Sequence, residues 1–211
     1  MLTTEQVNAN LSYLSIKRII DILGSLFGLI LLTPIFIILA IIIKIEDPKG
    51  PVFFKQVRVG KDETDFQMYK FRSMVTDAED RLKDLLALNE VSGAMFKMKE
   101  DPRITRIGKF IRKTSIDELP QLWNVLKGEM SLVGPRPPLP REVEEYTEYD
   151  KQRLLVTPGC AGLWQVSGRN NLGFDEMVEL DLKYINERSL FYDIKIIIKT
   201  IKIIIFPNNA Y

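Results

Sequence analysis

One uncharged apolar stretch, residues 22–43, constrains this chain more than any other feature. Its sequence is ILGSLFGLILLTPIFIILAIII. At about 1.5 Å of rise per residue, a helix of this length crosses a bilayer core of roughly 30 Å. Pro34 lacks an amide hydrogen and crowds the carbonyl four residues before it, so we expect a kink or break near Thr33. The stretch is too long for the core of a signal peptide, and we expect it to remain attached as an anchor.

Basic residues stand on both sides of this stretch: Lys17, Arg18, Lys44, Lys49, Lys55 and Arg58. Flanking lysines and arginines usually stay on the cytoplasmic side of a membrane, so neither end resembles an exported one. Two arrangements remain open on this pattern. The stretch is either a proline-kinked helix that spans the bilayer, or a re-entrant segment that turns at Thr33 and Pro34 and returns to the same face.

The composition removes several classes of function. Lysine and arginine together number 29 against 28 for aspartate and glutamate, so overall charge predicts no nucleic-acid partner. The chain has no histidine, which excludes Ser-His-Asp and Cys-His catalysis and histidine-ligated metals. Its single cysteine, Cys160, excludes an intramolecular disulfide. Any chemistry therefore depends on carboxylates, hydroxyls, lysines and arginines.

The rest of the pattern predicts a predominantly helical α+β fold in a single membrane-embedded domain. Residues 1–46 form a lead-in and the membrane helix, and residues 47–211 form a domain on the cytoplasmic face. Residues 52–59 and 66–72 alternate and are rich in β-branched and aromatic side chains, which predicts a short β-hairpin. Its basic residues, Lys55, Arg58, Lys70 and Arg72, suit either an anionic substrate or anionic lipid headgroups.

Two basic amphipathic helices are expected to lie at the membrane surface. The first begins with Asp101 as its cap and Pro102 as its first residue, and continues with apolar residues at helical spacing. The second covers residues 193–206, where Lys195, Lys199 and Lys202 stand among isoleucines. An ordinary core helix with a solvated lysine face is the alternative for this second segment.

The most informative segment is residues 112–126, RKTSIDELPQLWNVL. Ser115 and Glu118 fit a capping box, which would explain one carboxylate without catalysis. The adjacent carboxylates Asp117 and Glu118 at a helix start could instead hold Mg²⁺ while one of them attacks phosphorus. Both interpretations remain open on local spacing alone.

Two arginines stand in turns downstream. Arg136 lies between prolines in GPRPP, so its guanidinium is held on a stiff backbone that suits phosphate. A proline-rich surface turn with a solvated arginine is the alternative. Arg169 lies in the glycine turn SGRN, which is a weaker signal by itself.

Together these segments resemble the bacterial sugar transferases, the monotopic phosphoglycosyl transferases that begin capsule, exopolysaccharide and glycoprotein glycan assembly. The resemblance covers about residues 17–206. It rests on these segments in this order: KRIIDILGSLFGLILLTPIF, VFFKQVRVG, MYKFRSM, IRKTSIDELPQLWNVLKGEMSLVGPRP and TPGCAGLWQVSGRN. The order is far more specific than any single motif.

The resemblance implies transfer of a sugar phosphate, with a hexose favoured, from a UDP-sugar to undecaprenyl phosphate, with release of UMP. By that analogy Asp117 is the nucleophile of a covalent phosphosugar intermediate, and Asp117 and Glu118 hold Mg²⁺. The matching substrate-binding positions are Lys70, Arg112, Arg136, Arg169 and Asp193. Thr33 and Pro34 match the break of a re-entrant helix.

The expected setting is the cytoplasmic face of the bacterial inner membrane, with UDP-sugar, undecaprenyl phosphate and membrane lipids as partners. A homodimer is one assembly that the resemblance allows. Two rivals remain open: a glycosyltransferase that passes only the sugar and releases UDP, and a non-enzymatic membrane adaptor in which the Asp-Glu pair is merely a helix cap.

Overall fold

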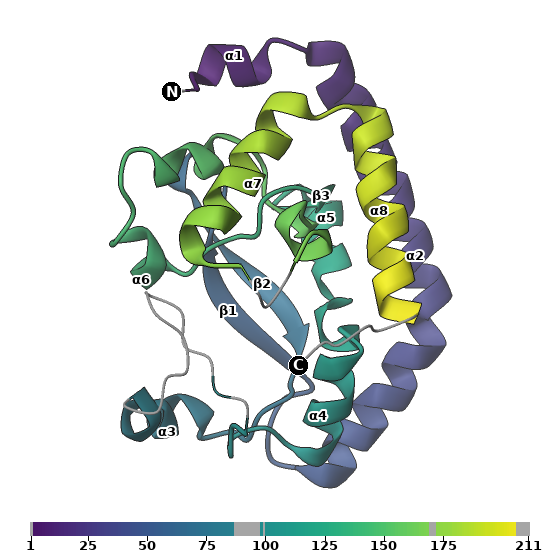
Figure 1. The fold of residues 1–211 in the computed structure, drawn as a ribbon. Coiled ribbons are helices and arrows are strands. Elements are labelled where there is room, and N and C mark those ends of the chain that lie inside the picture. Colours follow the sequence, from purple (N-terminus) through teal and green to yellow (C-terminus); the bar gives the residue numbers. More distant parts are fainter. Residues whose placement is uncertain (1, 87–97, 99, 169–171, 206–211) are drawn as a thin grey trace.

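The computed structural model describes residues 2–86, 98, 100–168 and 172–205, and helices predominate in it (Figure 1). The α-helices are α1 (Thr4–Asn8), α2 (Leu11–Glu46), α3 (Ala78–Leu85), α4 (Arg106–Lys113), α5 (Gln121–Lys127), α6 (Pro140–Val143), α7 (Phe174–Glu187) and α8 (Leu190–Ile205). The strands are β1 (Phe53–Val59), β2 (Asp65–Phe71), β3 (Ser131–Val133) and β4 (Gly159–Ala161). Short 3₁₀ turns are η1 (Lys61–Glu63), η3 (Ile116–Glu118), η4 (Asp150–Leu155) and η5 (Trp164–Val166). The α+β class with a helical majority is confirmed.

Helix α2 is 36 residues long and runs through Pro34 without interruption. The expected break in the helix at Thr33 and Pro34 is not seen, because both residues lie inside α2. The Thr33 hydroxyl donates to the carbonyl of Leu29 (2.8 Å) one turn earlier. Figure 1 shows that α2 bows around one side of the molecule instead of running straight. The sequence stretch thus forms one long, curved helix.

Most of α2 is uncovered by the rest of the chain. It is the one helix of the described residues with the length and apolarity to cross a membrane, and only 11% of its apolar window is buried. Its exposed large side chains include Leu23, Phe27, Ile30, Leu31, Ile37, Ile38, Ile41 and Ile45. An exposed apolar surface of this extent is unusual in a soluble monomer and suits contact with lipid.

The predicted β-hairpin is confirmed. Strands β1 and β2 pair antiparallel from Phe53 opposite Phe71 to Val59 opposite Asp65. Phe71 lies in a buried cluster with Leu39 and Ile43 of α2 and Ile111 of α4. The hairpin therefore packs against the second half of α2.

The larger core lies at the other end of the molecule, around a short parallel pair that the sequence analysis did not predict. Strand β3 pairs with β4, with Ser131 opposite Gly159 and Val133 opposite Ala161. This core combines Val133 and Ala161 of the pair with buried residues of α1, α7, α8 and the segments next to β4: Val7, Val156, Leu163, Val178, Leu182, Tyr184, Ile185 and Ile196. This core supports the loop that carries Arg136.

The predicted helix start at Asp101 and Pro102 is wrong. Helix α4 begins at Arg106, and the Thr105 hydroxyl caps it by accepting from the amide of Gly108 (3.0 Å). Asp101 instead pairs with Arg103 (2.6 Å), and both side chains are buried. The Asp101 carboxylate therefore pairs with Arg103 and does not cap a helix.

Helix α8 runs beside the first half of α2 (Figure 1). Ile196 faces the core, while a second apolar stripe of α8 is exposed: Phe191, Ile194, Ile198 and Ile201. Lys195, Lys199 and Lys202 are also exposed and lie next to that stripe. An ordinary core helix would bury its isoleucines, so this exposed stripe favours the interfacial interpretation.

Candidate active site

The two adjacent carboxylates lie in the tight turn η3 that joins α4 to α5. Ser115 precedes the turn in the left-handed conformation (φ 56°), and its side chain caps nothing. The capping-box interpretation of Ser115 and Glu118 is therefore wrong. Ile116 packs beside the cluster that holds Ile111, which anchors the start of the turn. Asp117 and Glu118 thus lie next to each other in the turn, and the Ser115–Glu118 capping box is not formed.

Glu118 forms an ion pair with a residue of the hairpin. The Lys70 ammonium of β2 donates to Glu118 Oε1 (2.7 Å). Burial alone would raise the pKa of Glu118, but the charge and hydrogen bond of Lys70 outweigh it. Arg136 and Arg58 act in the same direction, and the resulting pKa is about 2. Glu118 is therefore a fixed negative charge at neutral pH.

Asp117 is buried but differently surrounded. Within the described residues no side chain donates a hydrogen bond to its carboxylate. Burial raises the pKa of Asp117 to about 6. Lys70 and Arg112 oppose that increase, and Glu118 adds to it. A carboxylate that is ionised at neutral pH yet more basic than an exposed one is suited to nucleophilic attack.

Arg112 and Lys70 approach this turn from two different elements. Arg112 is half-buried in the last turn of α4, and Lys70 lies near the end of β2. Both lower the pKa of Asp117. The structure therefore brings together four of the predicted site residues, Lys70, Arg112, Asp117 and Glu118.

The GPRPP loop joins this group through Arg136, whose positive charge lowers the pKa of Glu118. Three hydrogen bonds hold the loop's prolines: the amide of Gly159 donates to Pro135 O (2.8 Å), Arg58 Nη1 to Pro137 O (3.0 Å), and the amide of Val59 to Pro138 O (3.0 Å). The interpretation of this segment as a solvated surface turn is wrong, since Pro135, Pro137 and Pro138 are buried. Arg136 is thus carried by a rigid support.

Arg58 belongs with this site, although the sequence pattern left its role open between an anionic substrate and lipid headgroups. It is only 3% exposed, and its second guanidinium nitrogen donates to Gln56 (2.9 Å). Burial, together with the neighbouring positive charge of Arg136, lowers the pKa of Arg58 to about 9. The alternation of the hairpin places Arg58 on one face but does not say which face is buried. Two adjacent guanidinium groups favour a bound anion beside them.

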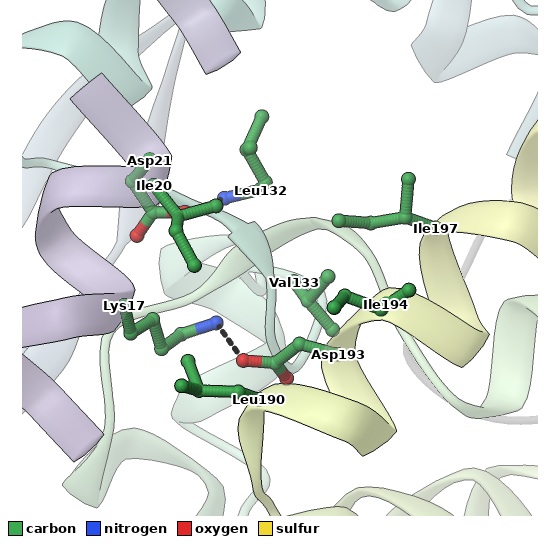
Figure 2. A pocket seen from close by; sticks show the side chains of 9 residues that line it. All are labelled: Lys17, Ile20, Asp21, Leu132, Val133, Leu190, Asp193, Ile194 and Ile197. Carbon is green, nitrogen blue, oxygen red and sulfur yellow. Dashed lines mark hydrogen bonds and ion pairs between the residues drawn. The ribbon is translucent and has the colours of Figure 1, made fainter. Parts of the chain in front are cut away.

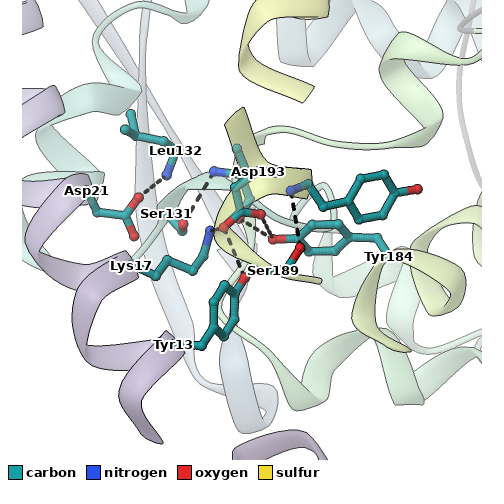
Figure 3. A network of polar contacts seen from close by, with 10 residues as sticks. Tyr13, Lys17, Asp21, Ser131, Leu132, Tyr184, Ser189 and Asp193 are labelled. Carbon is teal, nitrogen blue, oxygen red and sulfur yellow. Dashed lines mark hydrogen bonds and ion pairs between the residues drawn. The ribbon is translucent and has the colours of Figure 1, made fainter. Parts of the chain in front are cut away.

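Two further predicted residues lie elsewhere. Arg169 lies outside the described residues. Asp193 is buried in α8, where its carboxylate accepts from Tyr13 (3.0 Å), Lys17 (2.9 Å) and Tyr184 (2.7 Å), as Figure 3 shows. None of these partners contributes to the Asp117 group. The predicted role of Asp193 in substrate binding stays a prediction.

A small pocket opens beside Asp193, between α2, β3 and α8 (Figure 2). Lys17 and Asp21 of α2 line it together with apolar side chains of all three elements: Ile20, Leu132, Val133, Leu190, Ile194 and Ile197. The Lys17 ammonium is already paired with Asp193, and Asp21 accepts from the amide of Leu132 (2.9 Å). The pocket therefore holds no unpaired charge of these two residues.

The donor set at Asp117 and Glu118 fits a magnesium ion. Mg²⁺ in such sites takes one or two carboxylates and completes its octahedron with substrate phosphates and water. No group of three or more acidic, histidine or cysteine side chains that could enclose a metal occurs in the described part of the chain. A pair of carboxylates beside basic residues suits a metal ion that enters together with a diphosphate substrate. It suits less well a metal ion whose ligands all come from the protein.

Comparison with known proteins gives a consistent result. The sequence model described as bacterial sugar transferase matches residues 12–207. The chain is 54% identical over 200 residues to the galactosyl transferase CpsE of Streptococcus agalactiae serotype III, covering 94% of this chain and 44% of that protein. It is 46% identical over 200 residues to the undecaprenyl-phosphate galactose phosphotransferase of Salmonella typhimurium, covering 93% of this chain and 42% of that protein.

The exopolysaccharide production protein ExoY of Rhizobium meliloti is 38% identical over 199 residues, covering 92% of this chain and 88% of that protein. The chain thus spans less than half the length of the first two relatives and most of the third.

Proposed function

Because this chain belongs to the bacterial sugar transferase family, we propose that it is a phosphoglycosyl transferase that moves a sugar 1-phosphate from a UDP-sugar to undecaprenyl phosphate. The single observation that carries the proposal is the Asp117 carboxylate. It is buried, raised in pKa, without a side-chain donor among the described residues, and next to Lys70, Arg112 and Glu118. Such a group is prepared to attack phosphorus and is not occupied by a structural role.

The reaction has two displacements. A carboxylate oxygen of Asp117 forms a bond to the phosphorus that bears the sugar, and the bond from that phosphorus to the bridging oxygen breaks, so UMP leaves with the electron pair. An oxygen of undecaprenyl phosphate then attacks the same phosphorus. The carboxylate leaves, and the product is a lipid-linked diphosphate sugar.

The basic residues stabilise the charge of both displacements. Phosphoryl transfer depends on positioning and charge neutralisation more than on a strong base. Lys70, Arg112 and Arg136 lie around the turn and supply that charge without any histidine. Arg58 keeps the loop of Arg136 in place through the carbonyl of Pro137.

We propose Asp117 and Glu118 as the residues that hold Mg²⁺. The ion, when bound, neutralises part of the diphosphate charge that the nucleophile meets. Glu118 is well suited because its low pKa keeps it ionised at neutral pH. For Asp193 the family resemblance implies substrate binding, but its three internal donors support a structural role, which we propose instead.

We propose that α2 is re-entrant and that the catalytic domain lies on the cytoplasmic face. Both halves of α2 contact that domain. Asp21 accepts from Leu132 of β3, whereas Leu39 and Ile43 pack on Phe71 of β2. A straight spanning helix would carry one half away from the domain, which disagrees with contacts at both ends.

The lipid substrate also requires a site at the membrane, because extracting a polyprenyl chain costs about 0.8 kcal/mol for each exposed CH₂.

A hexose is the proposed sugar, and galactose is the first to test because two relatives are named for it. The purified chain in vesicles is incubated with radiolabelled UDP-galactose, undecaprenyl phosphate and Mg²⁺. We expect UMP and a lipid-linked galactosyl diphosphate. Release of UDP would identify a glycosyltransferase instead, as the name of CpsE allows. No turnover with any UDP-sugar would favour a membrane adaptor.

A further inference from the structure

The turn that carries Asp117 lies between two short helices, and each helix is joined to a different half of α2. Helix α4 ends at Lys113, η3 covers Ile116–Glu118, and α5 begins at Gln121. Few residues separate the turn from either helix. A displacement of α4 relative to α5 must therefore change the position of the turn.

Arg18 joins the first half of α2 to the end of α5. Its Nη1 donates to the carbonyl of Val125 (2.6 Å), and its Nη2 donates to the carbonyl of Leu126 (2.9 Å). These carbonyls lie in the last turn of α5, where few helical amides follow. Val125 O also accepts from the amide of Gly128 (3.0 Å). The guanidinium also complements the negative end of the helix.

Glu46 joins the last residue of α2 to the start of α4. Its Oε1 accepts from the amide of Arg106 (2.7 Å), and its Oε2 accepts from the amide of Ile107 (3.2 Å). Both amides belong to the first turn of α4, whose donors have no partner inside the helix. A carboxylate there is favoured by the helix dipole as well. Arg18 and Glu46 thus make the same kind of contact at opposite ends of the α4–η3–α5 segment.

Side-chain packing follows the same division. Before Pro34, Gly28 allows close approach of Leu122 from α5, since a Cβ built at Gly28 would lie 2.9 Å from that side chain. After Pro34, Phe36 packs against the cluster that also receives Ile107 of α4 and Ile116 of η3. The first half of α2 therefore supports α5, and the second half supports α4 and the start of the turn.

We propose that Arg18 and Glu46 are positioning residues for catalysis: they connect the two halves of the curved membrane helix to the two helices that flank Asp117. The curvature of α2 around Pro34 then sets where the Asp117–Glu118 turn lies. This inference rests on the proposed function in taking Asp117 as the nucleophile. Neither residue contacts substrate in this role, and each acts through a helix end.

The first test measures steady-state kinetics in phosphatidylcholine and phosphatidylglycerol vesicles. The variants are Arg18→Ala and Glu46→Ala. Since a displacement of about 1 Å at a reacting group can cost a hundredfold in rate, we expect kcat to fall roughly 10- to 100-fold while KM for the UDP-sugar stays within about twofold. Arg18→Lys and Glu46→Gln keep one hydrogen-bonding atom and should recover part of kcat.

The matched controls lie on the same helix. Lys44→Ala removes an exposed side chain two residues before Glu46 that bonds only to Pro48 within the described structure, and Ser15→Ala changes an exposed position three residues before Arg18. Both should keep wild-type kcat. An increase in KM at unchanged kcat, or equal losses in the controls, would overturn the inference.

The second test does not depend on the reaction. Hydrogen exchange is followed for a peptide that contains the amides of Glu118 and Leu119, which bond to Ser115 (3.2 Å) and Ile116 (3.2 Å) inside the turn. Arg18→Ala and Glu46→Ala should speed exchange there at least several-fold, and the two controls should not. If the wild-type chain releases no UMP, the proposed function fails, and exchange alone decides the inference. Unchanged exchange then overturns it.

Discussion

Two buried aspartates, Asp117 and Asp193, are exposed to nearly the same small extent, 8% and 6%, yet their surroundings differ in kind. The Asp193 carboxylate receives hydrogen bonds from two tyrosines and a lysine on α2 and α7. Asp117 receives none from the described side chains, and burial raises its pKa. A buried carboxylate with every donor in place stabilises a fold. For Asp117, which lacks side-chain donors among the described residues, we propose a reactive role, so the two aspartates are distinguished by their hydrogen-bond partners and not by their burial.

The strongest way to break this comparison is Asp117→Asn. The amide has nearly the same shape but is not a nucleophile, so we expect UMP release to fall by on the order of 10⁴-fold. The first measurement is the initial rate of UMP release with radiolabelled UDP-galactose in vesicles. The second is the radiolabel that stays on the protein after denaturation, which the variant should not retain. Membrane association should persist. Turnover near the wild-type rate would remove Asp117 from its proposed role.

The reciprocal change, Asp193→Asn, should affect stability and not the reaction. It leaves the Lys17 ammonium without its ion-pair partner in a mostly buried site, where its side chain is 12% exposed. We expect the free energy of unfolding to fall by about 3 kcal/mol. Urea titration in micelles, followed by tryptophan fluorescence, measures it. KM for the UDP-sugar should not change. A large rise in KM with unchanged stability would instead establish Asp193 as a substrate ligand and end the contrast.

The third test compares two lysines, one beside each aspartate. Lys70→Ala removes positive charge from Glu118 and from the surroundings of Asp117, so we expect kcat to fall by roughly 10²-fold. Lys17→Ala removes the cation beside Asp193 and should lower stability with little change in kcat per folded molecule. Equal effects of both substitutions on kcat would show that the two regions are not functionally distinct.

Parts of this arrangement follow from local sequence. The alternating residues 52–59 and 66–72 predict the hairpin to within one residue of β1 and β2. Adjacent carboxylates and a proline-flanked arginine are also visible without a structure. The resemblance to a known family then supplies their roles, which local spacing alone left open against a helix cap.

Other parts depend on residues far apart in the chain. The S-x-x-E pattern at Ser115 predicts a capping box, but Lys70, 48 residues away, pairs with Glu118. Asp101 resembles a helix cap until Arg103 takes its carboxylate in a buried pair. Strands β3 and β4 have three residues each, too few for a periodic pattern. In each case a tertiary partner wins over a local preference.

The smallest predicted effect tests whether the Asp193 region is purely structural. Tyr184→Phe removes one of the three donors to Asp193 (2.7 Å) and a contact to the carbonyl of Val133 (3.2 Å), but keeps the ring in the core. The loss of a buried hydrogen bond should lower the free energy of unfolding by about 1 to 1.5 kcal/mol. Urea titration in micelles measures it against Tyr192→Phe, a half-buried neighbour whose ring centre lies 6.2 Å away.

The control should change stability by less, because no hydrogen bond of the Tyr192 hydroxyl occurs among the described residues. Neither substitution should alter kcat or KM, since the donors that remain, Tyr13 and Lys17, keep Asp193 fixed in α8. A tenfold loss of kcat in Tyr184→Phe without loss of stability would connect the Asp193 network to the reaction. The coupling would run through Val133 and the short β3 segment, which lies just before the loop of Arg136.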